Sequence, residues 1–172
     1  MKFPYAIAAL AVAVLSACSS TPPVQAPAAL TTATPEQMIA TIDAAAGDGE
    51  GELAVQPLRN PMVEDLREQA RQARAQSRHD EAAAALDRAL ELVADDPALL
   101  QERAEAALLQ RDFERAGQLA ERAFALGAQV GPLCRRHWAT IEQVRLVQGD
   151  AEGAQSAQAQ VLGCKVEGPS RF

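Results

Sequence analysis

Aromatic residues are scarce in this sequence, at 3% of 172 residues, although the apolar set as a whole reaches 48%. Much of that apolar share is alanine, which is the best helix former and a poor strand former. A core built mainly from alanine and leucine also implies helices that approach one another closely. The composition therefore predicts an all-α fold.

An excess of basic charge is also missing. The formal net charge is −7 and the sequence pI is about 4.9, and the only lysines are Lys2 and Lys165. The chain has no basic stripe interleaved with aromatic residues, which is the usual footprint of a nucleic-acid-binding surface. We therefore expect no nucleic-acid partner.

Motifs of catalysis and metal binding are absent as well. The sequence has no nucleophile elbow, phosphate-binding loop or HExxH zinc motif. His79 falls at a predicted turn between helices, where packing explains it better than catalysis, and His137 is expected to be a surface or hydrogen-bonded residue. Cys134 and Cys164, with two scattered histidines, match no metal site. We therefore expect a protein that is not an enzyme and has no cofactor, metal or small-molecule substrate.

One apolar run, residues 5–15, is too short to cross a bilayer, which needs ~20 apolar residues, but has the length of a signal-peptide core. It leads into Leu15-Ser16-Ala17-Cys18 and then into a polar, proline-rich stretch. This tetrad resembles the lipobox of bacterial lipoproteins. The resemblance implies that cleavage exposes Cys18, which then carries acyl chains such as palmitate. An ordinary secretory signal with a chance cysteine is the alternative.

The residue after Cys18 indicates the membrane. It is Ser19 and not aspartate, and in Gram-negative lipoproteins an aspartate there resembles a retention signal for the inner membrane. Three acyl chains anchor a protein firmly, since each buried CH₂ contributes ~0.8 kcal/mol. The resemblance therefore implies a lipid anchor in the outer membrane and a chain that faces the periplasm.

Four segments are expected along the chain: a signal peptide (1–17), a lipidated N-terminus with a flexible tether (18–60), a helical domain (61–164) and a tail (165–172). The first part of the tether is uncharged and rich in Ser, Thr, Pro and Ala, and such a stretch buries too little apolar surface to fold. Pro35, with Thr34 as cap, predicts a short helix over 35–46. The 43 residues between lipid and domain could reach on the order of 140 Å at ~3.3 Å per residue.

A repeat of 34 residues relates segments 63–96 and 97–130. Corresponding positions carry leucine or a small residue: Leu66 and Leu100, Ala70 and Ala104, Ala82 and Ala116, Ala89 and Ala123. Small residues are needed where two helix backbones approach closely. The period and the pattern resemble the tetratricopeptide repeat (TPR), a helix–turn–helix unit.

A third, degenerate unit follows once four residues are inserted. Trp138 takes its large position and Gly149-Asp150 its turn, while Glu142 replaces one of the small residues. Degenerate units of this kind often cap a repeat array. The resemblance implies an all-α solenoid of about three helix–turn–helix units, and a plain alanine-rich helical bundle is the alternative.

Two cysteines remain besides Cys18. Cys134 begins the first helix of the last TPR-like unit and Cys164 ends its second helix. These helices run antiparallel in the repeat, so the two residues would lie side by side, and export places them in an oxidising compartment. We expect a disulfide that staples the terminal hairpin; two free buried thiols are the alternative.

TPR proteins commonly bind peptides in a concave groove lined by the first helix of each unit. The resemblance places these residues there: Arg67, Arg71 and Arg74; Gln101, Glu105, Leu108 and Leu109; Arg136, Gln143, Leu146 and Val147. Such a groove would be basic at its N-terminal end and apolar towards its C-terminal end. Arginine forks suit carboxylates, so the implied ligand is an acidic or C-terminal peptide segment. Alternatively, the arginines only pair with Glu64, Glu68 and their neighbours in water.

The order of lipobox, Ala/Pro-rich tether and small C-terminal TPR-like domain resembles the TPR-type lipoproteins that activate a class A penicillin-binding protein across the peptidoglycan layer. The resemblance implies a non-catalytic binding module whose partner is a periplasmic or inner-membrane protein. Two alternatives stay open. One is a pilotin or secretion-system lipoprotein that delivers a secretin subunit to the outer membrane, and the other is a structural envelope scaffold.

Overall fold

The computed structural model describes residues 27–47 and 60–165; the predicted signal peptide, Cys18 and the residues after Lys165 lie outside these ranges. Seven helices and no strand make up the described ranges, which confirms the all-α prediction. The helices are α1 (Pro35–Ala46), α2 (Pro61–Ala75), α3 (His79–Leu92), α4 (Pro97–Leu109), α5 (Phe113–Leu126), α6 (Gly131–Gln148) and α7 (Ala151–Gly163).

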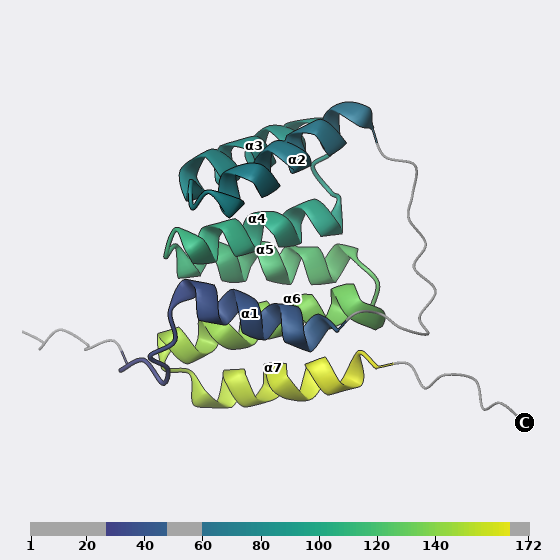
Figure 1. Cartoon of the computed structure of the whole chain (residues 1–172). Helices are drawn as coiled ribbons and strands as arrows, with labels where there is room; N and C mark the ends of the chain where they lie inside the picture. Colours follow the sequence, from purple (N-terminus) through teal and green to yellow (C-terminus); the bar gives the residue numbers. More distant parts are fainter. Residues whose placement is uncertain (1–26, 48–59, 166–172) are drawn as a thin grey trace, which may run out of the picture.

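Six of these helices form three hairpins, α2–α3, α4–α5 and α6–α7, which stack in chain order (Figure 1). Alanines of the 34-residue repeat lie where the helices meet: Ala89, Ala104, Ala116 and Ala123 have no exposed surface. Larger side chains at such well-packed positions typically cost ~1–3 kcal/mol. The small residues therefore set how closely the hairpins stack.

The first two hairpins begin at capped helices. The Asn60 side chain accepts a hydrogen bond from the backbone N–H of Met62, and the Asp96 side chain accepts from Ala98 and Leu99. In both cases a proline follows the cap, where its missing N–H costs nothing. Local sequence is therefore sufficient to set where α2 and α4 begin.

The turn of each hairpin contains one residue in the left-handed conformation. Ser77, Arg111 and Gly149 have φ of 57°, 62° and 76°, and positions 77 and 111 are one repeat apart. Glycine alone adopts this conformation without a Cβ penalty, so the first two turns carry a small strain. The common turn geometry shows that the degenerate third unit folds like the other two.

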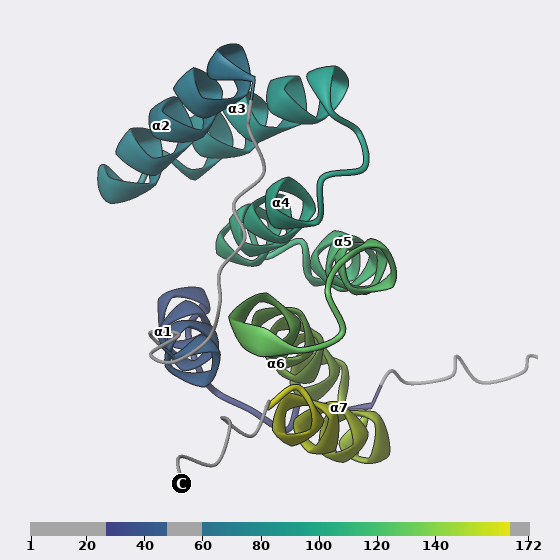
Figure 2. The same ribbon diagram turned by 90° about the vertical axis from the view of Figure 1, so that its right-hand side faces the viewer.

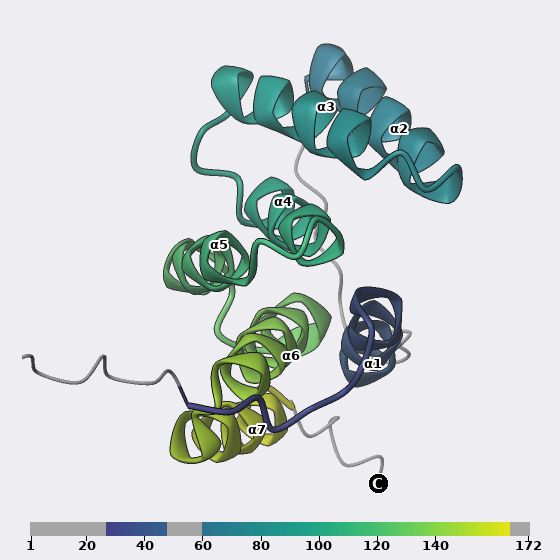
Figure 3. The ribbon, with the colours of Figure 1, turned by 90° about the vertical axis from the view of Figure 1, so that its left-hand side faces the viewer.

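Helix α1 was expected inside the tether, but in the structure it is part of the folded domain. It packs against α6 and, less extensively, α4. Figures 2 and 3 show it on the opposite side of these helices from α5. Its apolar side chains are buried there, and Ile42 has no exposed surface. We call the side formed by α2, α4 and α6 the groove face, so α1 lies on the groove face.

The position of α1 shortens the tether. Upstream of the helix, the backbone N–H of Leu30 donates to the carbonyl of Leu146 at 2.8 Å, and Pro27 and Ala28 lie against Gly149. Pro27 comes only nine positions after Cys18 in the sequence. At ~3.3 Å per residue the expected lipid anchor is then within about 30 Å of the domain, and not on the order of 140 Å.

Candidate functional site

An open cavity of about 290 Å³ lies on the groove face, between α2, α4 and the start of α6. The structure brings seven of the eleven predicted groove residues to its lining: Arg67, Arg71, Arg74, Gln101, Glu105, Leu109 and Arg136. Residues of all three TPR-like units therefore meet at one site, as the repeat register predicts.

The other four predicted groove residues do not line this cavity. Val147 packs, partly buried, against an apolar cluster that includes residues of α1. Leu108 is fully buried in an apolar cluster with Met38 and Ile42 of α1, and Gln143 is also buried. The Leu146 carbonyl is the acceptor for the segment that leads into α1. The apolar C-terminal end expected for the groove thus exists, but α1 covers it.

Two of the three arginines on α2 make the ion pairs that the alternative interpretation expected. Arg67 bonds Glu64 at 3.1 Å, and Arg71 bonds Glu68 at 2.6 Å. Arg67 also donates from Nε to Glu102 of α4 at 2.9 Å, and this bond raises the pKa of the arginine. The groove is therefore not simply basic, because carboxylates of α4 face the arginines of α2.

A buried carboxylate stands at the centre of the groove face. Glu105 is 1% exposed and accepts two hydrogen bonds from Arg136 of α6, one of them at 2.9 Å from Nη2. Arg74 of α2 lies 3.3 Å from the Glu105 carboxylate, and the Gln101 amide donates to the same carboxylate at 2.9 Å. Glu105 raises the pKa of Arg136 far above its usual range. One residue of α4 therefore joins the first helices of all three units.

Beneath this carboxylate lies a buried histidine. His137 has no exposed surface, and its Nδ1 lies 2.7 Å from the Gln101 side-chain oxygen. The Gln101 amide nitrogen donates to Glu105 and Thr140, so Nδ1 carries the proton in this bond. Nε2 is buried without a hydrogen-bond partner. His137 is thus not a surface residue, because the start of α6 faces α4 and not solvent, and the alternative expectation of a hydrogen-bonded histidine holds for Nδ1 alone.

Burial lowers the pKa of His137 to about 4, and this gives a pH prediction. Between pH 6.5 and 4 the unfolded chain binds a proton on this residue that the folded chain does not, so stability falls as the pH falls through this range. Between pH 7 and pH 4.5, we expect the free energy of unfolding of His137→Asn to fall by about 2–3 kcal/mol less than that of wild type. Urea unfolding at both pH values measures this, and equal losses in the two proteins would contradict it.

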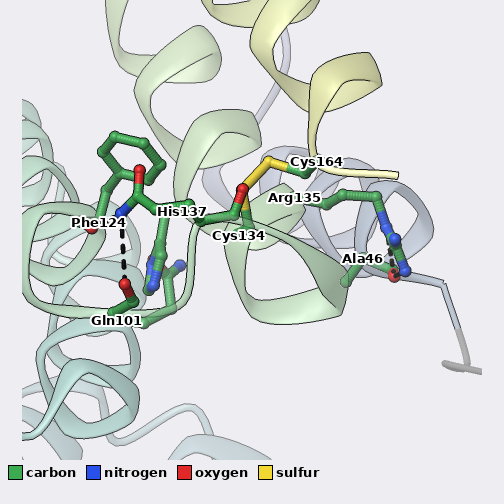
Figure 4. The surroundings of a disulfide bond; sticks show 9 residues. Ala46, Gln101, Phe124, Cys134, Arg135, His137 and Cys164 are labelled. Atoms are coloured by element: carbon green, nitrogen blue, oxygen red, sulfur yellow. Dashed lines mark hydrogen bonds between the residues drawn. A yellow bond between two sulfur atoms is a disulfide. The ribbon is translucent and has the colours of Figure 1, made fainter. Parts of the chain in front are cut away.

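The expected disulfide between Cys134 and Cys164 is present, with a Cα–Cα distance of 5.7 Å. Figure 4 shows it at the start of α6, with the Arg135 side chain extending to Ala46 of α1. The Arg135 side chain donates to the carbonyl of Ala46, the last residue of α1, at 2.6 Å from Nη2 and 3.0 Å from Nε. The disulfide thus fixes the end of α6 that holds α1.

Sequence reasoning missed two residues that hold α1, Arg135 of α6 and Asp43 of α1 itself. Asp43 bonds Arg136 at 2.7 Å and lies 4.0 Å from Arg74. Nothing in the local sequence marks Asp43 or Arg135, because their partners are 89 or more residues away or on other helices. Only the position of α1 on the groove face shows their roles.

Two negative findings hold within the ranges that the structure describes. No group of three or more His, Cys, Asp or Glu side chains there could hold a metal ion. Nor is any helix in those ranges both long enough and apolar enough to cross a membrane.

Comparison with known proteins gives one informative similarity. No family model matches the chain, and no curated protein matches its sequence. Among solved structures, the globular C-terminal domain of P. aeruginosa LpoP is similar, with a TM-score of 0.58 and 28% sequence identity. The match covers 99% of that domain and 61% of this chain. The helical fold is thus shared with nearly the whole of that isolated C-terminal domain.

Proposed function

We propose that this chain is an outer-membrane lipoprotein whose helical domain binds and activates a class A penicillin-binding protein. The similarity to almost all of the LpoP C-terminal domain carries the proposal. The lipobox ending at Cys18 supports it, because the predicted order of anchor, tether and domain resembles that of TPR-type lipoprotein activators. The function is a binding function, since the groove face carries paired charges and an open cavity.

Among the predicted groove arginines, Arg71 is the one to test. Its side chain is 56% exposed, and its ion-pair partner among the described residues is Glu68 of the same helix. Reversing the charge of Arg67 or Arg74 would instead break pairs with Glu102 or Glu105 of α4, and a loss of binding could then reflect a disturbed fold. Arg71→Glu avoids this ambiguity.

The experiment uses the lipid-free mature protein, residues 19–172, and a purified class A penicillin-binding protein. We expect binding and faster glycan polymerisation. Arg71→Glu should weaken the affinity about fivefold to tenfold, because an exposed charge contact contributes roughly 1 kcal/mol. The matched control is Arg122→Glu, an arginine of similar exposure that pairs with Asp95. Absence of binding by the wild-type protein would refute the proposal, and equal affinities of the two variants would remove Arg71 from the contact.

One observation favours a second candidate, the pilotin. With α1 in place, the domain begins at Pro27, nine positions after Cys18, which keeps this end of the domain within about 30 Å of the outer membrane. A secretin subunit in that membrane lies within such a reach, whereas a synthase anchored in the inner membrane requires a longer one. Capture of a secretin by the same mature protein, without capture of a synthase, would decide for the pilotin.

A further inference from the structure

We propose that the part of the groove face covered by α1 is a binding site for an amphipathic, acidic helix of the partner, and that α1 occupies it as an internal ligand that the partner helix displaces. The site itself stands on the contacts of α1. Only the choice of the synthase as the source of the helix rests on the proposed function.

The apolar contacts of α1 show what the site accepts. Met38, Ile39 and Ile42 are almost fully buried against α4 and α6, in one cluster with Leu108 and Val144. Their spacing of one and four residues places them on a single helix face. The outer face of α1 carries short or polar residues and is exposed. The site therefore takes a helix with aliphatic residues at positions i, i+1 and i+4.

The polar contacts add charge and direction. Asp43 follows the last aliphatic residue and bonds Arg136, with Arg74 close by. Arg135 binds the carbonyl of Ala46 at the C-terminal end of α1, where a helix has unpaired carbonyls and partial negative charge. A ligand helix thus needs a carboxylate at i+5 and must end near Arg135.

Two features make α1 displaceable. The hairpin helices are joined by turns of a few residues, whereas twelve residues, 48–59, separate the described end of α1 from Asn60. A lone helix of twelve residues is also marginal in water, so α1 gains chain entropy when it leaves. A partner helix that replaced it could extend over the open cavity to Arg71, a contact that α1 does not make.

Displacement would change the reach of the protein as well as its surface. With α1 docked, the domain begins at Pro27, nine positions after Cys18; with α1 released, it begins at Pro61, 43 positions after Cys18. The corresponding limits are about 30 Å and on the order of 140 Å. Occupation of the site by a partner helix would therefore be coupled to the longer reach that a partner beyond the peptidoglycan requires.

The test uses the lipid-free mature protein and, as probe, a fluorescent synthetic peptide of residues 27–47. Two variants release α1 by different means: Met38→Glu/Ile42→Glu charges its buried face, and Asp43→Arg repels Arg74 and Arg136 without changing the core. The matched control, Ala40→Glu/Ala44→Glu, places the same two charges on the exposed face of α1. Amide exchange establishes that α2–α7 stay folded while residues 35–46 lose protection.

We expect both release variants to bind the peptide at least tenfold more tightly than wild type and the control variant do, because their site is empty. A peptide carrying Ile42→Glu should bind none of them. Equal peptide binding by all proteins, or none by the folded release variants, would overturn the proposal.

A second arm adds the synthase to the release variants, with and without saturating peptide. Competition supports displacement by a synthase helix, and a synthase that binds equally well with the peptide present overturns it. A synthase that binds no form of the protein refutes the proposed function, while the peptide arm still decides the site.

Discussion

Replacing Glu105 with alanine is expected to lower the free energy of unfolding by about 3–5 kcal/mol, the usual cost of breaking a buried ion pair by removing one partner. The variant would leave Arg136 beside a buried void and would deprive Arg74 and Gln101 of their shared acceptor. These three side chains come from α6, α2 and α4, so the loss affects the stacking of all three hairpins. Urea-induced unfolding followed by circular dichroism measures it.

Two further variants test why Glu105 stabilises the fold. One separates the effect of its charge from that of its size, and the other compares a buried ion pair with an exposed one. Glu105→Gln keeps the size of the side chain but removes the charge that Arg136 needs, and should lose a large part of the same stability. Glu68→Ala removes the exposed partner of Arg71 and should cost no more than about 1 kcal/mol. If Glu105→Ala cost as little as Glu68→Ala, the buried cluster would not hold the hairpins together.

Removing the disulfide is expected to lower the free energy of unfolding by about 3–4 kcal/mol. Cys134 and Cys164 close a loop with a sequence separation of 30, and the chain-entropy model gives this order of magnitude for such a loop. Helix α7 is the last helix of the stack and packs mainly against α6, so it has few other contacts to hold it. The double variant Cys134→Ala/Cys164→Ala, compared with oxidised wild type by urea unfolding, measures the effect.

The site of the loss is as informative as its size. Amide exchange should increase at the end of α7 and at the start of α6, and therefore also in α1, whose last carbonyl is bound by Arg135. Wild-type protein in reducing agent should behave like the double variant. Unchanged protection of α1 in both samples would show that the disulfide and the α1 site are independent.

The sequence by itself determined the parts of the structure that depend on local pattern. The 34-residue period and its recurring alanines predicted hairpins at close range, and the capping residues Asn60 and Asp96, each followed by proline, set where α2 and α4 begin. Cys134 and Cys164 could be paired because the antiparallel arrangement of one hairpin fixes which ends meet. These features require only contacts within a helix or between neighbours in the repeat.

The left-handed turns at Ser77 and Arg111 were not predictable in the same way. Neither residue type favours positive φ, so no local signal marks these positions. The turns form because the packed helices on either side of them require that geometry. The small strain is offset by the packing of the hairpins.

Only the tertiary structure decided what the amphipathic helix over 35–46 packs against. Period 3.6 shows that Met38 and Ile42 share a face, but it does not say which surface buries that face. The same holds for charge: the arginines of α2 look like a basic groove in sequence, and the structure pairs them with Glu102 and Glu105 of another unit. Apolar faces and charges have no preferred partner in sequence, since burial and Coulomb attraction are satisfied by whatever the fold brings within a few ångströms.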